Sequence, residues 1–80
     1  MSMAILNILR AVEVLPNGTE RVYAGMWKVN ELDIAKDHMN RGITEHISNS
    51  GVFRIEKWFI TEQNCRVPLR REVMYDSRRG

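Results

Sequence analysis

The chain has 80 residues, of which 44% are hydrophobic and 28% charged, and its formal net charge is +2. This length suits one domain with a modest core and leaves little room for a large buried active-site cleft. The apolar content favours a folded chain over disorder, and no apolar run approaches the roughly twenty residues of a membrane span. A single cysteine, Cys65, excludes an internal disulfide and fits a reducing compartment, so we expect a cytoplasmic protein.

The first third of the chain predicts a β-hairpin. Residues 4–15 are apolar and rich in β-branched side chains, which favours a strand. The sequence PNGT at 16–19 is typical of a tight turn, because proline presets φ and Asn-Gly tolerates positive φ. Residues 20–29 then return as a second strand. One face of this strand carries Val22, Ala24 and Met26, and the other carries Tyr23, Trp27 and Val29.

Residues 31–41 predict a helix. Asn30 precedes it as a capping residue, and Glu31 and Asp33 place negative charge in the first turn, where the helix dipole favours it. Gly42 predicts the C-terminal end. Residues 43–48 remain open, either as more helix or as a short strand. The side chains that share the buried helix face are Leu32, Ala35, Met39 and Ile43.

The second half predicts two further strands. Residues 52–61 carry apolar side chains on both faces, which indicates a central strand or a strand with a partner surface. Residues 67–75 predict the last strand, with Leu69 buried, and Pro68 places it at an edge because proline donates no ladder hydrogen bond.

The predicted fold class is therefore α+β, a single antiparallel sheet of about four strands with one helix packed across one face, in the order β-β-α-β-β. Residues 1–76 are expected to form a single domain. Residues 77–80 are expected to form a flexible basic tail, because they have no apolar side chain to bury.

The sequence contains no recognisable catalytic or metal-binding motif. Cys65 could pair with His38 or His46, but no flanking sequence provides an oxyanion hole or a recognised ligand spacing. No glycine-rich phosphate loop is present either. We therefore predict a protein that is not an enzyme and uses no cofactor or metal.

Charge and aromatic residues supply the candidate binding surface. Residues 1–65 carry seven basic and eight acidic side chains, whereas residues 66–80 carry five basic and two acidic ones. The arginines either protect an edge strand as solvated charge, contact phosphates, or pair with an acidic protein surface. The aromatic side chains either pack under the helix or anchor a partner on the uncovered sheet face. The candidate partner-binding residues are Tyr23, Trp27, Arg54, Lys57, Trp58, Arg66, Arg70, Arg71, Arg78 and Arg79.

The segment MWKVNELDIAKDHMNRG, followed by VFRIEKW, resembles the small phage-encoded host-takeover proteins, anti-CRISPR proteins among them. The resemblance covers most of the chain and lies in its size, its order of elements and its lack of catalytic motifs. It implies a protein that binds a host machine and obstructs its nucleic-acid channel or its assembly. No residue role carries over, because proteins of this kind share no common motif.

The function predicted from these features is that of a non-enzymatic binding module. It would act as an inhibitor or adaptor that binds a host protein or ribonucleoprotein complex and blocks its nucleic-acid binding or its assembly. Two alternatives stay open. One is a small nucleic-acid-binding domain that uses the sheet aromatics and the C-terminal arginines, and the other is a homo-oligomeric structural protein such as a homodimer. No membrane partner is expected.

Overall fold

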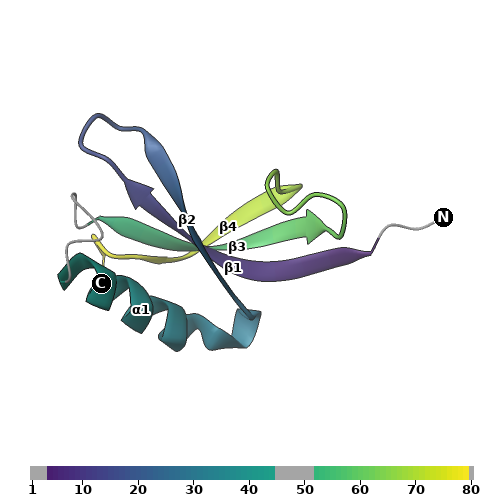
Figure 1. The fold of residues 1–80 in the computed structure, drawn as a ribbon, viewed down its shortest axis with the longest axis horizontal. Coiled ribbons are helices and arrows are strands. Elements are labelled where there is room, and N and C mark those ends of the chain that lie inside the picture. Colours follow the sequence, from purple (N-terminus) through teal and green to yellow (C-terminus); the bar gives the residue numbers. More distant parts are fainter. Residues whose placement is uncertain (1–3, 45–51, 80) are drawn as a thin grey trace.

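The computed structural model describes residues 4–44 and 52–79. In this part of the chain, β1 (Ile5–Val14), β2 (Glu20–Trp27), β3 (Phe53–Thr61) and β4 (Arg70–Asp76) form one antiparallel sheet in the spatial order β2-β1-β3-β4. A 3-10 turn, η1 (Val29–Glu31), leads into helix α1 (Leu32–Thr44), which lies across one face of the sheet (Figure 1). The predicted α+β class and the β-β-α-β-β order are confirmed.

β1 and β3 form the centre of the sheet. They pair without interruption from Ile5 opposite Thr61 to Glu13 opposite Phe53. Since directly paired residues lie on the same face and alternate along a strand, the odd-numbered residues of both strands face α1. The even-numbered residues face the opposite side. The prediction of a central strand over residues 52–61 is therefore confirmed.

β4 is an edge strand, as expected, but it begins at Arg70, three residues later than predicted. The side chain of Asn64 accepts hydrogen bonds from the backbone N–H groups of Arg66 and Val67, which keeps these residues in a loop. Leu69 follows this loop and is 61% exposed, so its predicted burial is wrong.

Helix α1 has other boundaries than predicted. Lys28, rather than Asn30, lies at the N-cap of the preceding 3-10 turn, and its backbone N–H donates to Glu31 Oε1 at 2.7 Å. The helix continues through Gly42 to Thr44, so Gly42 does not end it. Positions 43 and 44, which the sequence left open, are helical, and positions 45–48 lie outside the described residues.

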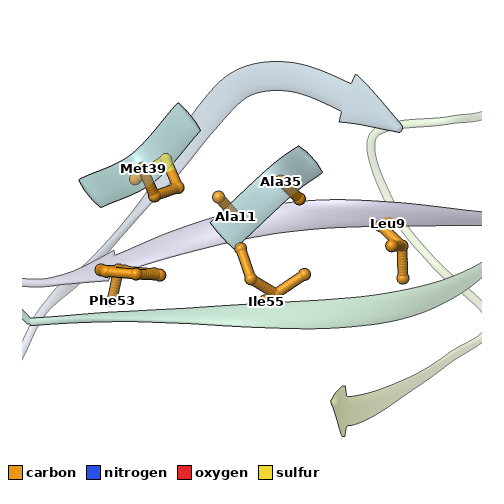
Figure 2. Packing of buried hydrophobic residues seen from close by; sticks show 6 residues of the cluster. All are labelled: Leu9, Ala11, Ala35, Met39, Phe53 and Ile55. Carbon is orange, nitrogen blue, oxygen red and sulfur yellow. The ribbon is translucent and has the colours of Figure 1, made fainter. Parts of the chain in front are cut away.

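The main core lies between α1 and the sheet. Ala35 and Met39 of the helix pack onto Ala11 of β1 and onto Phe53 and Ile55 of β3 (Figure 2). Leu32 packs against the same cluster, so the predicted helix face is confirmed for Leu32, Ala35 and Met39.

Two glycines shape the β1–β2 hairpin. Gly18 has a φ of 86°, which confirms the predicted turn because glycine adopts positive φ without a steric penalty. A Cβ atom on Gly25 would lie 2.9 Å from the Trp27 ring. Because Gly25 has no side chain, the Trp27 ring can pack directly against the backbone of β2 at this position.

Candidate partner-binding site on the open face of the sheet

The sheet face opposite α1, called the open face below, carries no second layer of helix or strand in the described part of the chain (Figure 1). Trp58 and Val12 nevertheless have exposures of only 2% and 0% on this face. Val12 and Trp58 pack with Ile60 and Ile8 in a second apolar cluster. Charged side chains lie beside this cluster in the sheet register: Arg10, Arg54, Glu56 and Arg71.

Glu56 lies at the centre of an ion-pair network on the open face. Its Oε1 accepts hydrogen bonds from Arg71 Nε at 2.7 Å and from Trp58 Nε1 at 2.9 Å. Its Oε2 accepts one from Arg54 Nε at 3.0 Å. Because the Glu56 side chain is almost fully buried, these donors replace the water that a carboxylate requires.

Glu20 extends this network to the far edge of the sheet. Its carboxylate pairs with Arg54 and, at 3.5 Å, with Arg71. Glu20 lies on β2 and Arg71 on β4, so the network joins both edge strands across β1 and β3. We call Glu20, Arg54, Glu56 and Arg71 the charged layer.

The charged layer holds its groups in their ionised forms. Burial raises the pKa of Glu56, but hydrogen bonds from Arg71, Trp58 and Arg54 together outweigh it, and the pKa lies below 4.5. The hydrogen bond from Arg54 likewise lowers the pKa of Glu20. Hydrogen bonds to Glu20 and to Glu56 raise the pKa of Arg54 and of Arg71, respectively.

We expect acid to weaken the fold through these carboxylates. The folded-state pKa values of Glu20 and Glu56 lie below the ordinary value of 4.5, so their contribution to stability is complete above that pH. It is lost as the pH falls through the folded values. Hydrogen bonds from Arg78 lower the pKa of Asp76 from 3.8 to about 2, which extends the loss to lower pH.

Urea unfolding at a series of pH values measures this loss. Glu56→Gln should make the free energy of unfolding fall less steeply below pH 4.5, because one of the titrating carboxylates is gone. A wild-type stability that stays constant down to pH about 2, or a Glu56→Gln variant with the wild-type slope, would contradict the prediction.

Arg10 brings a third guanidinium group to the open face. Its Cζ lies 5.1 Å from the centroid of the Trp58 ring, and its Nη2 donates to the backbone oxygen of Tyr23 at 3.2 Å. Its Nε is buried and has no hydrogen-bond partner. Among the described residues Arg10 forms no ion pair, so its positive charge adds to that of a charged layer in which two arginines are already matched by two glutamates.

Exposed apolar side chains surround this cation. Met26 is paired with Arg10 in the sheet, Val22 with Val12, and Val73 with Glu56, so all three point to the open face. Leu6 is an even-numbered residue of β1, like Arg10, and therefore lies on the same face of the sheet. These four residues are among the exposed large hydrophobic side chains: Leu6, Val22, Met26 and Val73.

Sequence reasoning missed Arg10 as a site residue. Arg10 interrupts the apolar alternation of residues 4–15. That interruption was the available signal, because a basic side chain inside an apolar strand has to lie on a face where its charge can be solvated or paired.

The predicted aromatic residues lie on different faces. Tyr23 and Trp27 lie on the helix side, where their rings lie 5.5 Å and 5.6 Å from the ring of His38 and pack against the core. Trp58 could lie near them only if β2 and β3 were neighbours in the sheet. That arrangement does not occur, because β1 separates β2 from β3 and Trp58 points to the open face.

The predicted basic residues are also divided between the faces. Arg54 and Arg71 belong to the charged layer, whereas Lys57 and Arg70 lie over the ring of Phe59, at 5.1 Å and 4.5 Å from its centroid. Phe59 faces the helix side, since it pairs with Asn7.

The C-terminal arginines are largely paired within the chain. Arg70 pairs with Glu72, and Arg78 with Asp76 at 2.9 Å. Arg71 pairs with Glu56. Among the described residues, Arg66 and Arg79 form no ion pair. Of the three roles considered for the C-terminal arginines, this arrangement favours protection of an edge strand by charge.

Ser77, predicted as the start of a free tail, is bonded to β3. Its N–H donates to the backbone oxygen of Phe53 at 3.0 Å, and its hydroxyl accepts from the N–H of Phe53 at 3.0 Å. Pairing with β3 therefore extends one residue beyond Asp76, the last residue of β4.

Comparison of the chain with protein-family models, with curated proteins and with solved structures finds no match. In the described ranges, no group of three or more acidic, histidine or cysteine side chains could hold a metal ion. No helix in those ranges is long and apolar enough to cross a membrane. Any functional proposal therefore depends on the geometry of the open face.

Proposed function

We propose that this protein is a non-enzymatic binding module that docks through its open face onto an acidic surface of a larger protein or ribonucleoprotein. The observation that carries the proposal is Arg10, a half-buried cation without a carboxylate partner among the described residues. A carboxylate of the partner would pair with this guanidinium and restore the balance of charge on the face.

The surroundings of Arg10 suit a protein partner. Exposed apolar side chains flank the cation, and a protein surface can cover them while it supplies the missing carboxylate. Arginine and tryptophan are the residue types that most often dominate interface energies. Arg10 is held in place before binding by its hydrogen bond to the Tyr23 backbone and by its contact with the Trp58 ring, which reduces the entropy lost on association.

The biological role that we propose is inhibition or adaptation of a host complex, as in the small phage-encoded proteins that the sequence resembles. A domain of 80 residues with a preformed docking face can block nucleic-acid binding or assembly by occupying a surface of the host complex. Such a role requires no catalytic group.

Nucleic acid is the alternative partner, and the geometry favours it less. Trp58 is 2% exposed, so a base cannot stack on its ring unless the covering arginines move. Arg54, Arg71 and Arg78 already pair with carboxylates, which reduces the charge available for phosphates. A titration with single-stranded DNA and RNA at two salt concentrations tests this alternative, and salt-sensitive binding would favour it.

Substitution of Arg10 tests the proposed function. Arg10→Met removes the charge but keeps a flexible apolar chain over Trp58, so the fold should persist. The tagged wild-type chain should recover a stoichiometric protein partner from a host lysate. For the purified partner, we expect Arg10→Met to raise the Kd at least about tenfold, as the loss of a charged hydrogen-bonded pair at an interface does.

Arg41→Met is the matched control. Arg41 lies on α1, on the other side of the sheet, and pairs there with Asp37 at an exposed position. This variant should bind like the wild type. Recovery of no protein partner, or equal affinity of the Arg10→Met and wild-type chains, would refute the proposed docking face, provided that circular dichroism shows the same fold.

A further inference from the structure

One stretch of β1 has a strand neighbour on one side only. β1 pairs with β3 from Ile5 onward, but its pairing with β2 begins at Leu9. Within the described residues, Ile5–Ile8 therefore form an open strand edge. Figure 1 shows this half of β1 extending past α1 toward the N-terminus.

The pairing pattern identifies the free backbone groups of this edge. The N–H of Val14 donates to the backbone oxygen of Val52 on the β3 side, and hydrogen-bonded pairs in an antiparallel ladder recur at every second residue. The even-numbered residues of β1 therefore bond to β3. Ile5 and Asn7 direct their N–H and C=O groups away from it.

This edge lacks the usual protection against strand pairing. Edge strands are commonly protected by charge or proline, and β4 carries Arg70, Glu72 and Asp76. The sequence ILNI of residues 5–8 contains neither. Ile5 and Leu6 are also exposed.

We infer that Ile5–Ile8 is a homodimer interface, in which β1 pairs antiparallel with β1 of a second copy across a two-fold axis at Leu6. In this register Ile5 lies opposite Asn7 of the other copy, and the free groups of both residues bond reciprocally. Leu6 lies opposite its own counterpart, where side chains of a non-hydrogen-bonded pair are closest. The result is a sheet continuous through both copies.

Charge and space favour a second copy as the occupant. Residues 5–8 carry no charged side chain, so the two copies do not bring like charges together at the axis. The same register brings the end of β3 in one copy, followed by Glu62, next to the end of β2 in the other, followed by Lys28. Both residues are exposed and form no ion pair among the described residues, so each can pair across the axis.

A cavity of about 370 Å³ leaves room for this arrangement. It is lined by the free part of β1, the end of β2 and the 3-10 turn η1, through the residues Asn7, Ile8, Met26, Trp27, Lys28 and Glu31. A strand that runs along Ile5–Ile8 passes this cavity where it approaches the end of β2. An axis at Leu6 pairs only residues 4–8 of the two copies, and a contact this short should let the dimer dissociate on dilution.

Sedimentation equilibrium of the full chain tests the inference. The mass of the wild type should rise from that of one chain to that of two between low micromolar and millimolar concentration. Leu6→Lys and Leu6→Glu should each remain monomeric, because two like charges then meet at the axis. Both substitutions are compatible with the monomer, since Leu6 is 42% exposed.

Mixing the two variants is the decisive step. If residue 6 lies opposite itself, the Leu6→Lys and Leu6→Glu chains should form a mixed dimer. Ile34→Lys, at an exposed position of α1, is the control and should dimerise like the wild type. A wild type that stays monomeric at millimolar concentration, a dimer that survives Leu6→Lys, or a mixture that stays monomeric would each overturn the inference. A test of docking through Arg10 uses a different substitution, so the two proposals can fail separately.

Discussion

Phe53→Ala should lower the free energy of unfolding by about 3–5 kcal/mol. Phe53 is 1% exposed, and it packs between the sheet and α1 in the cluster that contains Ala11, Met39 and Ile55. Its ring also lies 5.7 Å from the ring of Tyr75 on β4. Truncation would remove the largest of the fully buried side chains. Because β3 is paired with β1 on one side and with β4 on the other, it cannot shift toward α1 to fill the cavity.

Leu69→Ala is the control for this prediction. Leu69 is 61% exposed, so its truncation should change the free energy of unfolding by less than about 0.5 kcal/mol. Urea unfolding followed by circular dichroism measures both variants. Equal effects of the two substitutions would show that the core does not lie between β3 and α1.

Glu56→Ala should destabilise the fold by about 3 kcal/mol, although Glu56 lies on the face without a helix. The change leaves Arg54, Arg71 and the Trp58 indole N–H without their shared acceptor. Since Arg71 is partly exposed and can be rehydrated, the effect should fall at the low end of the range for broken buried ion pairs.

Glu56→Gln separates charge from hydrogen bonding. Its amide oxygen can still accept from Arg71 and Trp58, whereas the acceptor for Arg54 and the negative charge are lost, so its loss of stability should lie between those of Glu56→Ala and the wild type. Chemical unfolding at neutral pH measures the series. A Glu56→Ala variant as stable as the wild type would show that the charged layer is not part of the folded structure in solution.

The sequence predicted the elements of the fold better than their ends. The turn at residues 16–19, the apolar period of Leu32, Ala35 and Met39, and the two-sided pattern of residues 52–61 are local signals, and all three are confirmed. The helix start was predicted to within one residue, but the expected cap at Asn30 was wrong: Lys28 lies at the N-cap of η1, and its N–H donates to the side chain of Glu31. The last strand began late because Asn64 organises the loop before it.

The site was less predictable because it depends on strand order. Glu20 and Arg71 lie 51 positions apart in the chain, and only the order β2-β1-β3-β4 brings them onto the same network. The pairing register places Trp27 and Trp58 on opposite faces, because they lie opposite the adjacent residues Leu9 and Ile8 of β1. The composition of residues 66–80 indicated a basic cluster, but pairing in the sheet and in the C-terminal turn joins Arg70, Arg71 and Arg78 to carboxylates.

The two tryptophans offer a direct test of docking through the open face. Trp58 points to this face beside Arg10, whereas Trp27 lies on the helix side next to His38. Each indole N–H gives its own signal in a spectrum of ¹⁵N-labelled protein. In a titration with the partner protein recovered from the lysate, we expect the Trp58 signal to shift and the Trp27 signal to stay. A shift of Trp27 with an unchanged Trp58 would contradict docking through the open face.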